Sequence, residues 1–202
     1  MAKVEQIVAW EWAMFDQVHN IGGRASCQDD RATIEVMRSS QLLAWSEEML
    51  DSYAADLRDA RLMGRNLVAE KYGYMMGRTS PEEFDRIRDS LPPITAEKEE
   101  LMERICSLQM DWWRELNHSY PGLAGRGRSG DRDAGSMGGT SFETYLLGEL
   151  ATYSKGTLEL YWHYVCQLRE EGRSLNRMIL ENTVRQYGWS GLEDAERKLS
   201  GI

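Results

Sequence analysis

The chain has 202 residues, of which 42% are hydrophobic and 28% are charged, a composition typical of a folded protein rather than a disordered one. Its 33 acidic and 24 basic residues give a net charge of -9, which disfavours binding to nucleic acid or to an anionic membrane surface. At this length we expect one domain that covers residues 1–202.

Membrane, disulfide and metal signals are missing from the sequence. No apolar run approaches the ~20 residues that span a bilayer, and Lys3 and Glu5 interrupt the opening segment, where a signal peptide needs apolar residues. We therefore expect a cytoplasmic protein without a membrane partner. The three cysteines and three histidines lack metal-type spacing, so we expect neither a disulfide framework nor a metal site.

Helix boundary signals are easy to read along the chain. A Ser or Thr followed three residues later by Glu is typical of a helix start, and this pattern occurs at Ser80, Thr140 and Ser190. The predicted helices cover 3–19, 30–45, 47–76, 81–89, 95–116, 141–171, 175–187 and 191–199. Because runs that alternate apolar and polar residues are too short for strands, we predict an all-α fold, a single-domain antiparallel helical bundle with additional short helices.

The first predicted helix, 3–19, carries an acidic residue on its apolar face. Ile7, Met14 and Val18 lie on one stripe, because residues three and four apart share a helix face, and Glu11 lies in the middle of that stripe. A carboxylate directed into the interior needs a cation or a proton. We therefore expect Glu11 to have a buried partner.

The connection that follows, residues 20–30, permits two interpretations. Glycine at the end of the first helix and aspartate at the start of the second account for several of its residues as helix caps. Capping does not account for Asn20, Arg24 or Gln28. These side chains can alternatively present amide and guanidinium groups to the carboxylate of a ligand.

The second predicted helix, 30–45, supplies the expected partner of Glu11. Arg38 and Gln41 fall on the same face as Ile34 and Trp45, and Arg38 is the natural cation for the buried carboxylate. The indole of Trp45 is expected either to pack in the core or to stack on an aromatic substrate.

Within the third predicted helix, 47–76, Gly64 is expected to let another helix approach closely. Arg61, Arg65 and Lys71 are expected to extend from the apolar stripe to water. The alternative for Lys71 is that it turns toward the polar centre of the bundle.

Residues 122–139 break the helical pattern with seven glycines and three arginines. Such a segment cannot pack as core. It is either a disordered surface loop or a lid whose arginines, Arg126, Arg128 and Arg132, meet an anionic group of a ligand.

The predicted helix 141–171 repeats the pattern of polar groups on an apolar face. Leu146, Leu150 and Tyr153 form part of its stripe, with Glu149 at the edge. If these groups meet Glu11 and Arg38, two interpretations follow. The charges form a buried ion pair that fixes helix register, or they line a ligand pocket in which apolar surroundings raise the pKa of Glu11 and Glu149, as a general acid or base requires.

Motifs along nearly the whole chain resemble a bacterial family catalogued as domain of unknown function 4125. They are Trp10-Glu11-Trp12, Asn20, Gly22-Gly23-Arg24-Ala25, Cys27-Gln28, Met37-Arg38, Ser40-Gln41, Gly64-Arg65-Asn66, Glu70-Lys71-Tyr72, 140–146, Gly148-Glu149-Leu150 and Thr152-Tyr153-Ser154. The resemblance implies no particular reaction or cofactor. It does favour a shared site over accidental burial of polar groups, because the motifs include Glu11, Arg24, Gln28, Arg38, Gln41 and Glu149.

These observations favour an acid/base enzyme that needs no metal or cofactor. Its substrate would be a small carboxylate-bearing, amino-acid-like metabolite, and the reaction a cyclisation or condensation, an isomerisation or an elimination. Glu11 would move the proton and Glu149 would assist. The expected ligand-binding residues are Asn20, Arg24, Gln28, Arg38, Gln41, Trp45 and Tyr153.

Two hypotheses from other classes stay open. In the first, the chain is a non-catalytic module that binds a small molecule or another protein through the same polar centre. In the second, it is a purely structural bundle that forms a homodimer through tryptophans on its outer faces, such as Trp12 and Trp162.

Overall fold

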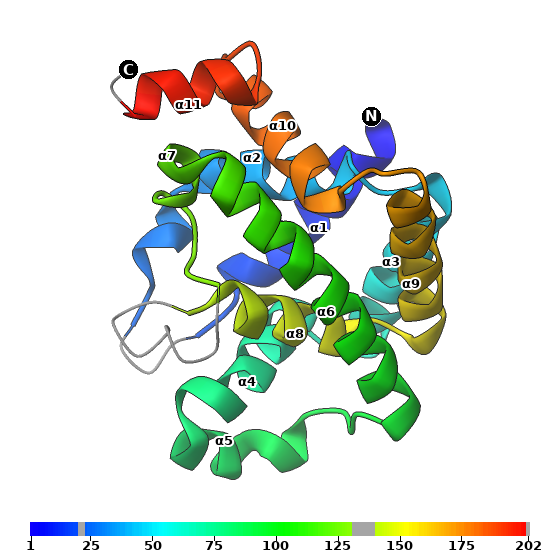
Figure 1. Ribbon diagram of the computed structural model, residues 1–202. Coiled ribbons are helices and arrows are strands. Elements are labelled where there is room, and N and C mark those ends of the chain that lie inside the picture. The colour runs from blue at the N-terminus through cyan, green and yellow to red at the C-terminus, as the bar shows by residue number, and fades with distance from the viewer. Residues whose placement is uncertain (20–22, 131–139, 201–202) are drawn as a thin grey trace.

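The computed structural model describes residues 1–19, 23–130 and 140–200, and these residues form helices and connecting turns without strands (Figure 1). The all-α prediction is therefore confirmed. The α-helices are α1 (Ala2–Asp16), α2 (Arg31–Leu42), α3 (Glu47–Leu62), α4 (Leu67–Thr79), α5 (Pro81–Ile87), α6 (Ala96–Ser119), α7 (Pro121–Ala124), α8 (Phe142–Thr152), α9 (Lys155–Glu170), α10 (Leu175–Gln186) and α11 (Leu192–Ser200), and the short 3-10 helices are η1 (Ser26–Asp29) and η2 (Arg88–Ser90).

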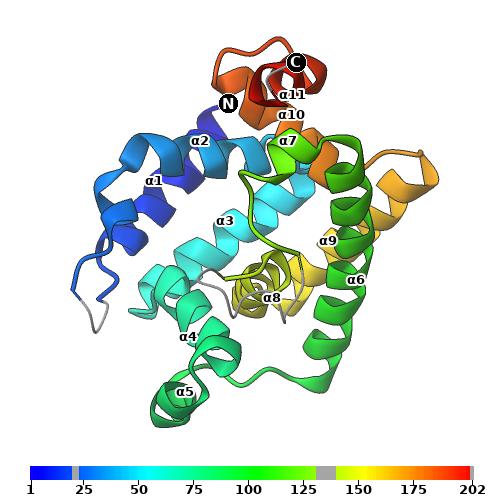
Figure 2. The ribbon, with the colours of Figure 1, turned by 60° about the vertical axis from the view of Figure 1, so that its left-hand side comes forward.

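Helix α8 is the centre of the fold. Figure 2 views it nearly end-on, with α3, α4, α6 and α9 around it. From Leu146 to Thr152 each of its residues is buried, as expected for a helix without a solvent-exposed face. A smaller second core joins α10 and α11 to the end of α6. None of the helices in the described part of the chain combines the length and the apolar character needed to cross a membrane.

Two of the predicted helices are each divided into two. The segment predicted as one helix over 47–76 breaks at Gly64, whose positive φ of 70° ends α3, while the side chain of Asn66 caps α4. The segment 141–171 breaks at Tyr153, which is extended, and Ser154 then accepts a hydrogen bond from the Thr157 amide to start α9. Helical periodicity continued across both breaks, so it concealed them.

The glycine that permits close helix packing is Gly148, not Gly64. A Cβ atom at Gly64 would meet no atom within 4 Å, so the expectation of a close helix contact there is wrong. At Gly148 a Cβ atom would lie 3.0 Å from the backbone oxygen of Lys71 and closer still to Cγ of Met75. Helix α4 therefore packs against the backbone of α8 at Gly148. This contact brings Lys71 next to Glu149, the residue that follows Gly148.

Part of the Gly- and Arg-rich segment has a fixed structure. The amide of Phe142 donates to the backbone oxygen of Ser129 at 2.7 Å, and Gly130 is buried against the ring of Trp113. In the described structure residues 122–130 therefore include part of α7 and these contacts, while the choice between a disordered loop and a lid over 122–139 stays a prediction. Residues 131–139, which include Arg132, lie outside the described residues.

Replacing Gly148 with alanine tests the close packing of α4 on α8. The added methyl group has to displace Met75 or the backbone at Lys71, and we expect Gly148→Ala to lower the free energy of unfolding by about 1–3 kcal/mol. Gly156→Ala is the matched control, because its Cβ would find open space on α9; we expect no loss or a gain of up to about 1 kcal/mol. Urea unfolding of both variants measures the difference, and equal stabilities would contradict the packing argument.

Candidate functional site

Arg38 of α2 is the centre of a buried polar cluster. Its Nε and Nη2 atoms donate to the two carboxylate oxygens of Glu11 on α1, at 2.8 and 2.6 Å. Its Nη1 atom donates to Oε1 of Glu149 on α8 at 2.9 Å and to Oε1 of Gln41 at 2.7 Å. One planar guanidinium therefore bridges two carboxylates from different helices, and the geometry toward Glu11 is the bidentate fork that arginine favours.

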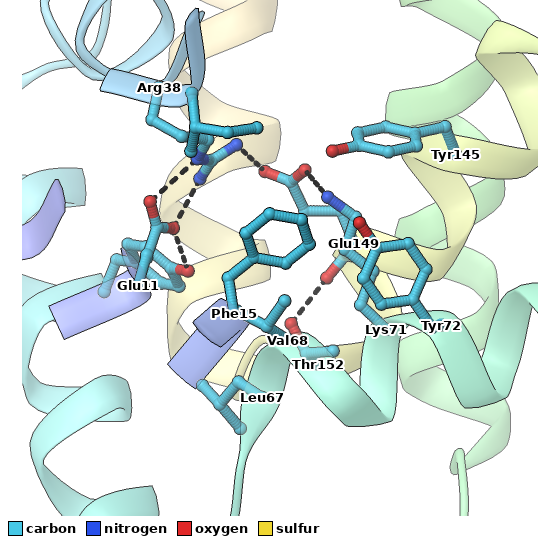
Figure 3. A pocket seen from close by; sticks show the side chains of 12 residues that line it. Glu11, Phe15, Arg38, Leu67, Val68, Lys71, Tyr72, Tyr145, Glu149 and Thr152 are labelled. Atoms are coloured by element: carbon cyan, nitrogen blue, oxygen red, sulfur yellow. Dashed lines mark hydrogen bonds and ion pairs between the residues drawn. The ribbon is translucent and has the colours of Figure 1, made fainter. Parts of the chain in front are cut away.

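Four side chains, Arg38 included, donate hydrogen bonds to the carboxylate of Glu149. Its Oε1 atom accepts from Gln41 and from Tyr153 as well as from Arg38, and its Oε2 atom accepts from Nζ of Lys71 at 3.1 Å. Glu11 accepts a further hydrogen bond of 2.6 Å from the hydroxyl of Tyr53. The result is a chain of alternating charges, Glu11, Arg38, Glu149 and Lys71, which we call the charged cluster (Figure 3).

The charged cluster borders a small pocket that is partly open to solvent, with about 50 Å³ of space for the centre of a water-sized sphere. Arg38 and Glu11 lie toward one side of this pocket and Tyr145, Tyr72 and Lys71 toward the other, with Glu149 between them (Figure 3). The lining residues are Glu11, Phe15, Ile34, Arg38, Tyr53, Leu67, Val68, Lys71, Tyr72, Tyr145, Glu149 and Thr152. Apolar walls with a few convergent polar groups are the usual composition of small-molecule sites.

Electrostatics holds Glu149 and Lys71 in their charged forms. Burial by itself would raise the pKa of Glu149, but Arg38 and Lys71 together bring that pKa well below its ordinary value. Burial would lower the pKa of Lys71, yet the Glu149 carboxylate leaves it raised. The expectation of a raised pKa is therefore wrong for Glu149, because sequence periodicity placed one cation near it and the structure supplies two.

The tyrosines beside the carboxylates serve as proton-bearing hydrogen-bond donors. Burial and then the negative charge of the neighbouring carboxylate raise the pKa of Tyr53, beside Glu11, and of Tyr153, beside Glu149, well above the ordinary value. Both hydroxyls therefore remain protonated near neutral pH and hold the carboxylates in fixed orientations.

Five of the side chains that the sequence indicated meet in one place. Glu11, Arg38, Gln41, Glu149 and Tyr153 form one continuous hydrogen-bond network. Gln41 and Tyr153 contact the pocket only indirectly, because they donate hydrogen bonds to the carboxylate of Glu149 but do not line the pocket.

Other predicted binding residues have different surroundings. Arg24 pairs with Asp16 and Asp29 at the surface, at 2.6 and 2.8 Å. The side-chain amide of Gln28 donates to the backbone oxygens of Phe15 and Val18 and thus caps the end of α1. Neither of them lines the pocket, because both hold together the connection between α1 and α2. Asn20 lies outside the described residues.

Trp45 is buried in an aromatic cluster behind the site. Its ring lies 5.5 Å from that of Tyr53 and 5.9 Å from that of Tyr153, both edge to face. It is 6% exposed and does not line the pocket. The packing interpretation therefore describes Trp45 better than stacking on a substrate.

Lys71 and Tyr53 are the site residues that sequence reasoning placed poorly. Lys71 was expected to reach water, but it is 8% exposed and turns inward, as the alternative interpretation proposed. A usable signal existed, because Lys71 lies on the apolar stripe of its helix between Val68 and Met75. No comparable signal pointed to Tyr53. No three His, Cys, Asp or Glu side chains in the described ranges are arranged to hold a metal ion.

Comparison with known proteins yields one family and no characterised relative. Residues 2–197 match the family described as "Protein of unknown function (DUF4125)". No curated protein and no solved structure matches the chain. The match covers each helix that contributes to the charged cluster, so the cluster lies within the region that the family shares.

Removing the charge of Glu149 tests the electrostatic description. Glu149→Gln leaves Arg38 and Lys71 without a shared anion, and we expect a loss of about 3–5 kcal/mol in the free energy of unfolding at pH 7. Because the folded-state pKa lies below the ordinary value of 4.5, the stabilisation is present above that pH and decreases as the pH falls toward the folded-state pKa. The difference from the unmodified protein should therefore narrow between pH 7 and pH 3 in urea unfolding.

The control for this measurement is Glu97→Gln. Glu97 forms an exposed ion pair of 2.6 Å with Lys155, and screening by water makes such pairs weak. A loss of stability with Glu149→Gln no larger than with Glu97→Gln would contradict the cluster's role.

Proposed function

Because the chain belongs to the DUF4125 family, whose description assigns no activity, we propose from the site alone that it is an acid/base enzyme acting on a small carboxylate-bearing metabolite. The observation that carries this proposal is the placement of the charged cluster. All four of its charged side chains, from α1, α2, α4 and α8, line a pocket instead of being sealed within the core.

The groups around the pocket divide into those that move a proton and those that stabilise charge. Glu11 faces the pocket with its carboxylate oriented by Arg38 and Tyr53, so it is our candidate base. When Glu11 takes a proton from the substrate, negative charge remains on the substrate. The cations Arg38 and Lys71 are placed to stabilise that charge. Apolar side chains such as Phe15 and Val68 would hold the rest of the substrate.

Isomerisation, elimination and ring closure fit these groups best. Each of these reactions can proceed by moving protons between carbon or nitrogen and a nearby carboxylate. Glu149 is held ionised by two cations, so its contribution is orientation and charge balance rather than proton donation.

A second candidate function is binding without turnover. It is favoured by a specific observation, because Arg38 and Glu149 are already saturated with partners and such a network is rigid. A rigid, charge-balanced site recognises a ligand well even where it transfers no proton. Under this alternative the chain is a sensor or carrier for the same class of small molecule.

Thermal unfolding in the presence of small carboxylates and amino acids tests for a ligand. A compound at about 100 times its dissociation constant adds about 2.7 kcal/mol of stability, which raises the unfolding temperature measurably. We expect stabilisation by carboxylates and not by the corresponding amides. A broad panel without any stabilising carboxylate would contradict both candidate functions.

Glu11→Gln separates the enzyme from the binding module. For a ligand found by thermal unfolding, we expect the unmodified protein to catalyse exchange of ligand hydrogens with D2O, followed by NMR, and Glu11→Gln to lower that rate by about 100-fold or more while the ligand still binds. Glu5→Gln, on the exposed face of the same helix, is the control.

The fold of Glu11→Gln is checked by circular dichroism, because the substitution weakens a buried ion pair. If it does not fold, Tyr53→Phe serves instead, since it removes only the hydroxyl that orients Glu11. Ligand binding without any exchange in the unmodified protein would favour the binding module.

A further inference from the structure

The arginines expected to hold a ligand carboxylate are occupied by other partners. Four hydrogen bonds connect Arg38 to Glu11, Gln41 and Glu149. Arg24 is engaged by two aspartates at the surface. A ligand carboxylate that bound Arg38 directly would compete with two carboxylates already bound there, so a cation without a carboxylate partner is the better candidate for direct contact with the ligand carboxylate.

Arg128 is a cation beside one residue of the pocket wall, Tyr145. Its guanidinium carbon lies 4.4 Å from the centroid of the Tyr145 ring, and Nζ of Lys71 lies 3.5 Å from the same centroid. Tyr145 lines the pocket. Two positive charges therefore lie against one ring of the pocket wall, an arrangement favourable to both through the negative face of that ring.

Within the described residues Arg128 has no carboxylate partner. Its Nη1 atom donates to the backbone oxygen of Thr140 at 3.2 Å, and the side chain is exposed. The charged groups that line the pocket, by contrast, are each paired with an opposite charge. Among the described residues, Arg128 is thus a cation next to the pocket wall whose charge is not compensated by a carboxylate.

The backbone next to Arg128 is held in place. Ser129 and Gly130 accept hydrogen bonds from the amides of Phe142 and Glu143 at the start of α8. Gly130 packs so closely on the ring of Trp113 that a side chain would not fit. The position of Arg128 beside Tyr145 is therefore supported by its neighbours in sequence.

Charge balance favours an anionic ligand at this end. Glu11 and Glu149 offset Arg38 and Lys71, and Arg128 adds one positive charge in a chain whose net charge is -9. Burial raises the pKa of Tyr72 to about 12, and the charges of Lys71 and Arg128 act against that rise. The field of Arg128 therefore reaches a side chain that lines the pocket.

We propose that Arg128 provides the carboxylate-binding group at the Tyr145 end of the pocket, and that it selects anionic ligands over neutral ones. This inference rests on the proposed function and names the group that recognises its ligand class. The carboxylate lies beside Tyr145, and the remainder of the ligand extends along the apolar wall toward Glu11.

Binding of fluoroacetate, with the neutral fluoroacetamide as its partner probe, tests the proposal by 19F NMR. Both are small enough for the pocket and report binding directly. We expect the unmodified protein to bind fluoroacetate more tightly than fluoroacetamide, and Arg128→Gln to weaken fluoroacetate binding by about fivefold, typical of one partly exposed charged contact. Arg128→Lys should retain part of the affinity, and Arg114→Gln, at an exposed arginine of α6 with no part in the pocket, should change nothing.

The possible failures are distinguishable. If Arg128→Gln binds fluoroacetate as tightly as the unmodified protein, or loses affinity for fluoroacetamide to the same extent, the role of Arg128 is wrong while the pocket's function stands. If the unmodified protein binds neither fluoroacetate nor any carboxylate in the thermal panel, the proposed function fails and this inference fails with it.

Discussion

The burial of Glu149 is the constraint on which the rest of the site depends. Helix α8 lies at the centre of the fold without a solvent-exposed face, so its carboxylate must find compensation among side chains, since an unpaired buried charge is strongly unfavourable. Two neighbouring helices supply it. Gly148 allows α4 to approach and bring Lys71, and α2 brings Arg38, which in turn fixes the carboxylate of Glu11.

Helical periodicity predicted the part of this network that lies on well-formed helices. Glu11 and Arg38 each fall on an apolar stripe and Glu149 lies at the edge of one, so their spacing indicated that these charges are buried and need partners. The pairing of Glu11 with Arg38 was expected, whereas spacing did not decide that Glu149 joins them. Periodicity could not predict where a helix stops, because Gly64 and Ser154 leave the apolar pattern uninterrupted while they change the chain direction.

Residues outside regular helices were the hardest to place from sequence. The side chains of Arg24 and Gln28 are suited both to ligand binding and to stabilising a turn by hydrogen bonds. Which of the two roles they have depends on where α1 ends, and the sequence pattern does not define that position. Lys71 presented the opposite difficulty. A lysine at the edge of an apolar stripe usually reaches water through its long stem, and the neighbouring α8 carboxylate that reverses this preference is distant in sequence.

Stability alone does not account for a cluster of this kind. Replacing buried ion pairs by apolar side chains of similar volume is often neutral or stabilising, so a fold that needed only a rigid centre would do as well with leucine at these positions. Here the four charges also border a pocket, and Arg128, a cation beside Tyr145 of the pocket wall, lacks a carboxylate partner among the described residues. Charge is therefore distributed unevenly along the pocket, because it is balanced beside Glu149 and positive beside Tyr145. A ligand with one anionic end can be oriented by that field before any proton moves, which is the prerequisite for selective chemistry at Glu11.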